Sequence, residues 1–359
     1  MVAKFLLKPT VSMAPGDTVV MTSLVRDIKL KYGDDIQVDV VSSYPLLWEN
    51  NPHLTKLGLN QPDVQTVPLT YVPEMHDSQR GVHHHYIAAW HKAFQRATGL
   101  PVPVYHPKGD LHPDERETPL VSGRYWVIVP GGKRDMTNKW WHTDRYQEVV
   151  DRLRPLGFRF IQEGATKPLC YHPPLNGVLN LVGRTNQRDL MANIRFAEGV
   201  ICGVTHQMHL AAVFDKPCVV LAGGREEPWW EAYSNQFGAF GPECTPVKTP
   251  HVYLHTLGRL DCCKVRGCWR RRTVPLNDGH PHYDQTTCCN PVLTERHPVP
   301  RCLDMISVED VISGVLSYYG PDRLPPPDPN APEPKLLREP APITYATALP
   351  PLAAAKASS

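Results

Sequence analysis

The sequence predicts an α/β protein with two Rossmann-like, doubly wound domains that face a central cleft. This rests on a length of 359 residues, on strands that alternate with helical segments in both halves, and on a proline-rich break between the halves. A chain of this length exceeds one small core and suits two domains of ordinary size. Helices between successive strands indicate parallel sheets, which bind ligands at the carboxyl ends of their strands.

The first half begins with a βαβ unit. A short strand is expected at 4–7, and a turn at Gly16 leads into a helix whose apolar residues recur at helical spacing. The alternating, β-branched run 36–41 predicts a second parallel strand, and 83–98 predicts a later helix.

The second half repeats this alternation more regularly. It begins with an apolar strand at 125–130 and continues to Ala222. The expected segments are helices at 144–156, 187–196 and 206–214 and strands at 158–162, 178–182, 199–202 and 218–222. The loops after Pro130, Cys202 and Ala222 should converge on one cleft.

Composition sets the boundaries of the parts. Proline and charge concentrate at 101–119, which suits a linker, and the residues after Pro321 are too rich in proline to form a core. The predicted parts are residues 1–105 as the N-terminal domain, 106–122 as the linker, 123–320 as the C-terminal domain with a cysteine module at 261–303, and 321–359 as a disordered tail.

Charge and hydropathy exclude several classes of protein. Lysine and arginine number 38 against 36 acidic residues, a formal net charge of +2, so no broad field attracts nucleic acid or an anionic membrane. No apolar run approaches the roughly 20 residues of a spanning helix, and the opening residues lack the features of a signal peptide. We expect a cytoplasmic protein with no membrane span that does not bind nucleic acid.

Gly16 and Asp17 form the first candidate site. Glycine lets the backbone pass close to a ligand, and the carboxylate follows at the N-terminal end of a helix. A carboxylate there is more commonly an N-cap than a catalyst. Both interpretations are kept.

Two further strand ends predict an anion site. Gly131 and Gly132 expose backbone N–H groups and Lys139 supplies a compact positive charge, which together suit a diphosphate; the alternative is a solvated lysine. After the strand at 199–202, a hydroxyl, two imidazoles and a helix N-terminus favour negative charge. The candidates there are Thr205, His206, Met208, His209 and Leu210. Gly223 opens a loop suited to closing over the same cleft, or an irregular surface turn.

Six of the ten cysteines lie between Cys262 and Cys302. In a chain without a signal peptide such crowding favours a metal over disulfides, and four thiolates suit zinc or iron. Buried free thiols and disulfides formed on oxidation are the alternatives.

Taken in order, these elements resemble the heptosyltransferases, the ADP-heptose-dependent glycosyltransferases of family 9, over residues 3–318. The resemblance rests on the Gly-Asp turn with Thr22 following, the Gly-Gly…Lys-Trp segment, the Thr-x-x-x-His-Leu-Ala-Ala helix start at 205–212, and Lys216-Pro217 before a glycine loop. It implies the GT-B fold. It also implies transfer of a heptose-like sugar from a nucleotide-diphosphate donor to a hydroxyl of a glycan or protein, by direct inverting displacement.

The resemblance also implies roles for individual residues. Asp17 matches the general base that takes the proton of the acceptor hydroxyl. Lys139 matches the lysine that neutralises the leaving diphosphate, and Thr205 and His209 match residues around that diphosphate. No catalytic metal is expected.

This chain departs from the family motif Asp-Thr-Gly-x-Ser-His at three positions. Val204 stands at the Asp, His206 at the Gly and Met208 at the Ser. The change at Val204 removes a carboxylate that the resemblance would place against the donor sugar or ribose.

The cysteine cluster resembles a subset of this family that glycosylates bacterial autotransporter proteins and has an iron-binding cysteine motif. This implies one structural zinc or iron closed by four ligands. The expected set is Cys263, Cys268, Cys288 and Cys302. Because adjacent residues differ mainly in side-chain direction, Cys262 can replace Cys263 and Cys289 can replace Cys288.

Other functions compete with sugar transfer. A nucleotide-sugar epimerase or hydrolase would use the same two domains and act on the donor alone. A non-catalytic scaffold would explain the change at Val204. The histidines at 83–85 are expected in the acceptor cleft or on the surface, without a metal, and a homo-oligomer is compatible with each of these functions.

Overall fold

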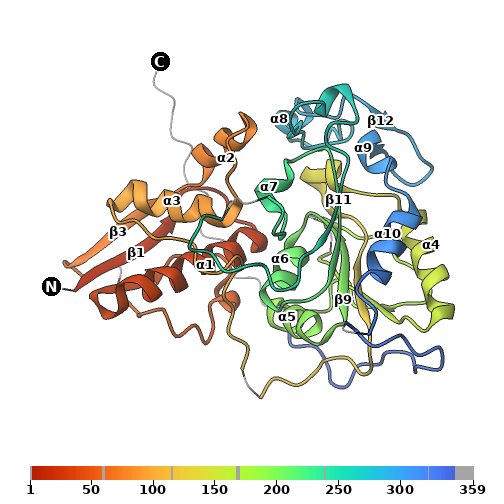
Figure 1. Cartoon of the computed structure of the whole chain (residues 1–359), viewed down its shortest axis with the longest axis horizontal. Helices are drawn as coiled ribbons and strands as arrows, with labels where there is room; N and C mark the ends of the chain where they lie inside the picture. Colours follow the sequence, from red (N-terminus) through yellow and green to blue (C-terminus); the bar gives the residue numbers. More distant parts are fainter. Residues whose placement is uncertain are drawn as a thin grey trace.

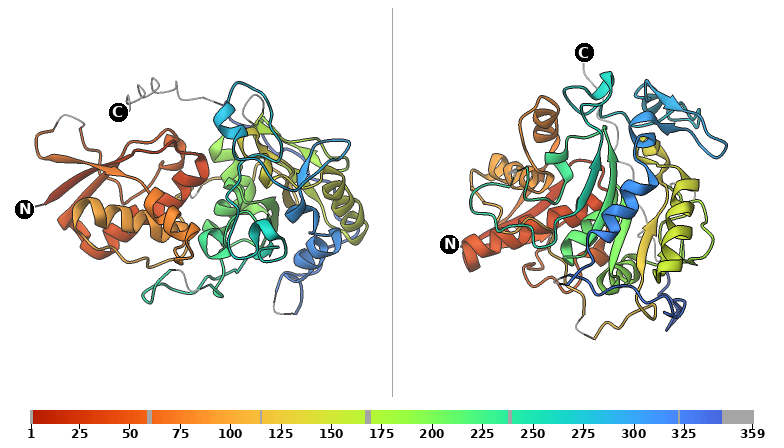
Figure 2. Two further views of the ribbon diagram at one scale, coloured as in Figure 1. Left: turned by 90° about the horizontal axis from the view of Figure 1, so that it is seen from above. Right: turned by 45° about the vertical axis from the view of Figure 1, so that its right-hand side comes forward.

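The computed structural model describes residues 2–58, 61–114, 116–166, 170–237, 240–321 and 323–343. Two α/β domains lie side by side, and helix α1 (Pro15–Tyr32) of the first packs against α6 (His206–Val213) of the second (Figure 1). The views of Figure 2 separate the N-terminal domain, in red and orange, from the C-terminal domain, in yellow to blue. Among the described residues, no helix has the length and apolar character needed to cross a membrane.

The N-terminal domain contains a three-stranded parallel sheet in the order β2-β1-β3. Its elements are β1 (Ala3–Pro9), α1, η1 (Gly33–Asp35), β2 (Ile36–Val40), η2 (Pro45–Leu47), β3 (Val64–Leu69), α2 (Val72–Gln79) and α3 (Tyr86–Thr98). The sequence predicted β1, β2, α1 and α3. It missed β3, because Pro68 interrupts that strand at an edge of the sheet, where proline is tolerated.

The C-terminal domain contains a six-stranded parallel sheet in the order β11-β10-β9-β4-β6-β8. Its strands are β4 (Trp126–Val129), β6 (Phe160–Gln162), β8 (Leu179–Asn180), β9 (Gly199–Gly203), β10 (Cys218–Gly223) and β11 (Val252–His255). The chain starts in the middle at β4, runs outward through β6 and β8, and returns to the other side through β9. This doubly wound order confirms the predicted fold class and puts the switch point, where such sheets bind ligands, between β4 and β9.

Helices cover both faces of the larger sheet. The helices are α4 (Thr143–Leu153), α5 (Gln187–Phe196), α6, α7 (Pro228–Glu231), α8 (Pro281–Asp284), α9 (Arg301–Asp304) and α10 (Val308–Leu316). The minor elements are β5 (Gly132–Lys133), η3 (Arg134–Lys139), η4 (Arg154–Leu156), β7 (Cys170–Tyr171), η5 (Asp261–Cys263), β12 (Pro291–Val292) and β13 (Val299–Pro300). Helices α4 and α10 pack against each other over one face, and α6 packs against β9 and β10.

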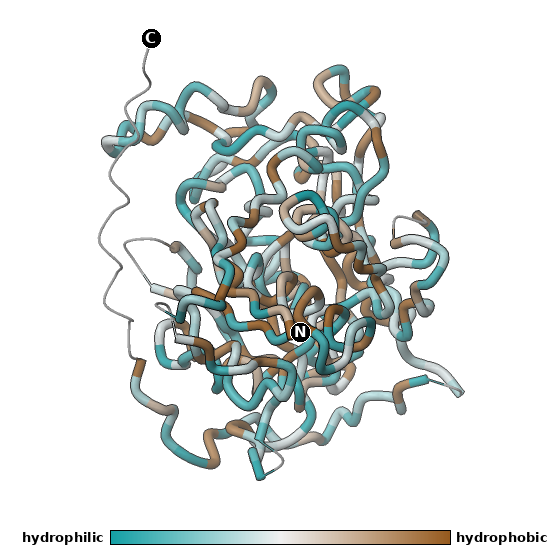
Figure 3. Tube along the Cα trace, turned by 90° about the vertical axis from the view of Figure 1, so that its left-hand side faces the viewer, coloured by the Kyte–Doolittle hydropathy of each residue, from teal (hydrophilic) through white to brown (hydrophobic). Residues whose placement is uncertain are grey.

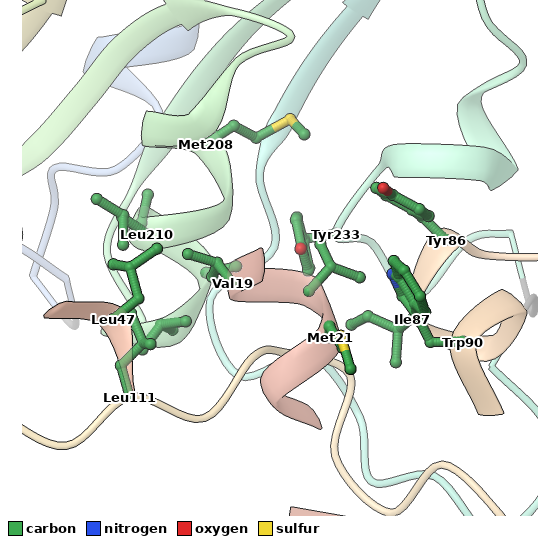
Figure 4. Close-up of a cluster of buried hydrophobic side chains, with 14 of the residues drawn as sticks. Val19, Met21, Leu47, Tyr86, Ile87, Trp90, Leu111, Met208, Leu210 and Tyr233 are labelled. Atoms are coloured by element: carbon green, nitrogen blue, oxygen red, sulfur yellow. The ribbon is translucent and has the colours of Figure 1, made fainter. Parts of the chain in front are cut away.

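The apolar core crosses the boundary between the domains. Val19 and Met21 of α1 belong to the same buried cluster as Met208 and Leu210 of α6. Figure 4 shows Leu210 facing Val19 across this boundary, and Figure 3 shows apolar segments gathered inside the molecule. The two domains are therefore joined by burial of apolar surface as well as by the chain.

No helix or strand occurs between α3 and β4 in the described residues, which suits the linker predicted at 106–122. Residues 323–343, expected to be disordered, instead run along the C-terminal domain. Arg159 there donates hydrogen bonds to the carbonyls of Pro329 and Ala331. Leu336 also packs against the apolar core, and composition missed this order because a few apolar contacts among many prolines give no periodic pattern. The rest of the predicted tail, 344–359, lies outside the described residues.

Candidate active site

The N-termini of two helices from different domains meet beside the switch point. A Cβ added to Gly16 of α1 would lie 3.1 Å from the ring of His209 in α6. Glycine is what permits this approach. Helix α6 follows directly on β9, so both N-termini border the place where a doubly wound sheet binds ligands, and their backbone N–H groups favour an anion.

Asp17 is engaged through both carboxylate oxygens. The backbone N–H of Ala14 donates to Oδ2 at 2.7 Å, which caps α1, and the hydroxyl of Tyr86 donates to Oδ1 at 2.7 Å. The side chain is half-buried at the cleft. Burial raises the pKa of Asp17, while the two hydrogen bonds lower it. Capping and base catalysis are compatible here, because each oxygen has a second lone pair.

Lys139 ends η3 and points at a buried carboxylate. Its Nζ lies 2.8 Å from Oε1 of Glu226, and the guanidinium of Arg225 contacts the same oxygen. Burial lowers the pKa of Lys139 to about 8, and the carboxylate of Glu231 opposes that shift. Glu226 thus places the cations of Lys139 and Arg225 beside one carboxylate oxygen. The oxygens of a diphosphate would interact with the same two cations.

The glycine pair after β4 is required by the backbone itself. Gly131 has φ of +90°, and a Cβ there would lie 2.1 Å from the carbonyl oxygen of Tyr171. Gly132 has φ of +155°, and its Cβ would approach the indole nitrogen of Trp140 at 3.4 Å. The turn into η3 therefore explains both glycines without a ligand.

The predicted residues of α6 divide into two groups. Thr205 is the N-cap residue, with its hydroxyl donating to Gln207 Oε1 at 2.8 Å, and His209 Nδ1 lies 2.7 Å from the Tyr233 hydroxyl. These residues border the cleft. Met208 and Leu210 are fully buried in the apolar core shown in Figure 4, where Leu210 faces Val19 across the domain boundary.

Both histidines of α6 are uncharged at neutral pH. Burial lowers the pKa of His206 to about 3 and that of His209 to about 3. His206 Nε2 lies 2.9 Å from Gln187 Oε1, which fixes its ring. The imidazoles therefore offer hydrogen bonds and not positive charge, and Lys139 with the helix N-termini supplies the attraction for an anion.

Glu231 is a site residue that sequence reasoning missed. It is only 7% exposed at the end of α7, and its Oε2 has no hydrogen-bond partner in the described part of the chain. Its carboxylate contributes an upward shift to the pKa of Asp17 and opposes the burial that lowers the pKa of Lys139, so it lies within electrostatic reach of both the base and the cation. The segment Glu-Glu-Pro-Trp-Trp-Glu contains three acids, and no periodicity distinguishes this one.

The loop after β10 contacts the N-terminal domain through two tryptophans. Trp230 of α7 stacks on Tyr86 of α3 with ring centroids 5.2 Å apart, and Trp229 stacks on His83 at 3.9 Å. The indole N–H of Trp229 also donates to Ser78 Oγ at 3.1 Å. These contacts join α7 of the C-terminal domain to α2 and α3 of the N-terminal domain.

Six cysteines line one small cavity beside this loop. They are Cys262, Cys263, Cys268, Cys288, Cys289 and Cys302. A Cβ on Gly224 would lie 2.7 Å from the Cys263 sulfur, and one on Gly223 would lie 3.1 Å from the Cys302 sulfur. Gly223 therefore packs against the cysteine module, and the thiols support the loop that holds Arg225.

The thiols are suitable ligands for a metal, but their sulfurs lie farther apart than the sulfurs of a metal-bound site. Tetrahedral zinc at about 2.3 Å from each sulfur sets sulfurs roughly 3.8 Å apart. In the described part of the chain no three cysteine sulfurs lie within 4.8 Å of one another. The other thiols that raise the pKa of Cys302 are Cys268, Cys288 and Cys263, whereas Cys262 interacts first with Cys289. The predicted quartet is thus one group of neighbours, which a metal would draw together.

Two α/β domains that bring a carboxylate, a lysine and two helix N-termini to one cleft define the GT-B architecture of glycosyltransferases. A family model described as glycosyltransferase family 9 (heptosyltransferase) matches residues 53–251. The chain belongs to this family and is a glycosyltransferase. No curated protein sequence matches it.

Solved structures share the fold at low sequence identity. The iron-containing dodecameric glycosyltransferase TibC of enterotoxigenic E. coli matches with a TM-score of 0.56 and 14% identity, over 88% of this chain and 76% of that one. TibC in complex with ADP-D-β-D-heptose gives 0.54 and 14%, over 88% and 77%. The family 9 glycosyl transferase of Veillonella parvula gives 0.51 and 11%, over 88% and 97%. At these identities the likeness establishes the fold.

Proposed function

We propose that this enzyme transfers a heptose-like sugar from an ADP-linked donor to a hydroxyl of a glycan or protein, by direct inverting displacement. The donor diphosphate would lie at the switch point, between Lys139 and the N-terminus of α6. The acceptor would lie against the N-terminal domain, where Asp17 takes its proton. The observation that supports this most is that Asp17 and Lys139 come from different domains, and that the carboxylates of Glu231 and Asp17 both raise the pKa of Lys139 against the effect of burial.

The charges match the direction of the reaction. The raised pKa of Asp17 makes it a stronger base than an exposed aspartate, and the hydroxyl becomes more acidic as it attacks. Negative charge develops on the departing diphosphate, which the ammonium of Lys139 and backbone N–H groups stabilise. Closure of α7 over the cleft would limit hydrolysis of the donor.

Glu231 would supply the carboxylate that the family motif has at the position of Val204. A buried carboxylate oxygen without a partner costs free energy unless a ligand satisfies it. Hydroxyls of a donor sugar placed between Asp17 and Lys139 would donate to it. We therefore assign recognition of the donor sugar to Glu231.

We also propose that Cys263, Cys268, Cys288 and Cys302 hold one structural zinc or iron. Six thiols around one cavity support this, as does the iron-containing relative TibC. These four residues would bind the metal through thiolates. The metal would fix the loop of Gly223 and Gly224 from outside the cleft, with no open position for chemistry.

The transferase would act in the cytoplasm, and we propose that it self-associates, because TibC is described as dodecameric. Sedimentation of the purified protein measures its mass directly. A monomer at micromolar concentration would contradict self-association and separate this protein from TibC in that respect.

The function is tested by titrating ADP, UDP and ADP-heptose into wild type and Asp17→Asn by calorimetry. We expect ADP to bind more tightly than UDP, and Asp17→Asn to keep the affinity for ADP-heptose while transfer falls at least about 100-fold. Asp35→Asn, in η1 just beyond the C-terminal end of α1, is the matched control and should transfer normally. Full turnover by Asp17→Asn would exclude Asp17 as the base, and no binding of any nucleotide would overturn the donor assignment.

A further inference from the structure

A second group of metal-type ligands lies away from the cleft, where the linker passes over the N-terminal domain. His53, in the loop between η2 and β3, and Asp110 and His112 of the linker offer ligand atoms that all lie within 4.8 Å of one another. The Nε2 atoms of His53 and His112 lie 3.4 Å and 2.8 Å from Oδ2 of Asp110. Their side chains are 19–27% exposed, so they are accessible but not freely mobile.

The backbone holds Asp110 in place without any ion. Its N–H donates to Oγ1 of Thr22 at 2.7 Å, and Thr22 is fully buried in α1. A Cβ added to the preceding Gly109 would lie 2.4 Å from the Val19 carbonyl oxygen, so the linker packs directly on the helix. The carboxylate is thus positioned before binding, which reduces the cost of forming a site.

His112 is held from both domains. Its carbonyl oxygen accepts hydrogen bonds from Asn50 Nδ2 at 3.4 Å and from the guanidinium of Arg188 at 3.3 Å. Asn50 belongs to the N-terminal domain and Arg188 to α5 of the C-terminal domain. The cluster therefore lies where the linker contacts both.

We propose that His53, Asp110 and His112 bind a divalent transition-metal ion such as Zn²⁺. Two imidazoles and one carboxylate suit such ions, and three protein ligands leave a fourth position for water. The ion fastens the linker to the N-terminal domain and restricts domain movement. This inference is independent of the proposed sugar transfer, because metal binding is measured without any substrate.

The test is a calorimetric titration of Zn²⁺ into the protein as purified. We expect wild type to bind one equivalent more than His112→Gln, and Asp110→Asn, which preserves volume, to bind at least about 10-fold more weakly. His106→Gln, a linker histidine outside the cluster, should match wild type. Equal binding by wild type, His112→Gln and Asp110→Asn would overturn the proposal.

A parallel titration with Co²⁺ separates this site from the cysteine cluster. Thiolate-bound Co²⁺ absorbs strongly through charge transfer, whereas imidazole and carboxylate ligands give only weak ligand-field bands. The added equivalent should show weak bands that His112→Gln loses. Strong charge-transfer absorption that grows equally in both proteins would place the ion on the thiols and contradict the assignment.

Discussion

The hydroxyl of Tyr86 donates a 2.7 Å hydrogen bond to Oδ1 of Asp17, although 69 residues separate them in the chain. Tyr86 begins α3 and Asp17 lies in the first turn of α1. The same tyrosine stacks on Trp230 of the other domain. One residue thus connects the proposed base with the segment that closes the cleft.

Replacing Tyr86 by phenylalanine should shift the acid limb of the pH–rate profile to higher pH. The hydrogen bond favours the carboxylate and lowers the pKa of Asp17, against burial that raises it. A base acts only when deprotonated, so activity falls as the pH drops through its pKa, and without Tyr86 that fall begins at higher pH. Profiles of kcat/KM for wild type and Tyr86→Phe measure the shift.

Tyr32→Phe is the matched control for that experiment, because its hydroxyl donates to the carbonyl of Pro101 far from the cleft. Its profile should coincide with that of wild type. An acid limb that stays in place in Tyr86→Phe would mean that another group sets it.

Affinity for ADP should decrease as the pH rises through about 8. Burial lowers the pKa of Lys139 to about 8, so the ammonium is present below that pH and is lost above it. Arginine stays protonated throughout this range. Lys139→Arg should therefore remove the decrease, and Lys139→Met should bind at least about 10-fold more weakly at pH 7. Calorimetry from pH 6.5 to about 9.5 checks both, and a loss of affinity that persists in Lys139→Arg would assign it to another residue.

Glu231→Gln should separate recognition of the sugar from binding of the nucleotide. The amide keeps the shape of the side chain but removes a charge that lies near Asp17 and Lys139. We expect ADP affinity to remain, and kcat/KM for the sugar donor to fall at least about 10-fold, or about 1.4 kcal/mol in transition-state stabilisation. Glu243→Gln, an exposed acid outside the site, is the control. Unchanged kcat/KM in Glu231→Gln would contradict the assignment of sugar recognition to Glu231.

Loss of a cysteine ligand should release the metal and loosen the loop beside it. Cys268→Ser and Cys302→Ser should contain less than half the wild-type metal and unfold at a Tm lower by more than about 5 °C. Gly223 packs on Cys302 and Gly224 packs on Cys263, so loss of the metal should disturb the loop that holds Arg225. ADP should therefore also bind these variants more weakly.

Two control variants identify the ligand set. Cys170→Ser lies outside the cluster, and Cys262→Ser removes the thiol that interacts first with Cys289 and only then with Cys263 and Cys268. Both should keep the metal. If Cys262→Ser loses the metal and Cys263→Ser retains it, then Cys262 is the ligand in place of Cys263. Full metal content in every single variant would exclude a four-thiolate site.

Local patterns in the sequence were enough for five of the six strands of the larger sheet. Gly199 to Gly203 and Cys218 to Gly223 are short, continuous apolar runs bounded by helices, so their strands follow from the length and composition of the runs. Helix α2 and strand β11 escaped prediction because short elements with proline or mixed polarity show no clear period. The course of residues 323–343 also escaped, since backbone contacts and the isolated packing of Leu336 leave no periodic hydrophobic pattern.

For the candidate site, the sequence predicted several individual residues but not the contacts between them. Asp17, Lys139 and His209 were found because strand-to-helix turns and glycines mark ligand loops locally. Glu231 and Tyr86 were missed because their importance depends on neighbours more than 60 residues away. Met208 and Leu210 occupy motif positions, yet they are fully buried in the apolar core that joins the two domains, since the surroundings of a side chain on a helix depend on what packs against it.

By itself, the sequence determined the α/β class, the order of the elements and the clustering of six cysteines, since these follow from periodicity, turn residues and spacing along the chain. Only the tertiary structure decided that Tyr86 bonds to Asp17, that Glu231 is buried within electrostatic reach of a base and a cation, and that His53 meets Asp110 and His112. Such contacts depend on the packing of segments far apart in the chain, and burial then changes the pKa values and the cost of leaving a polar atom unpaired.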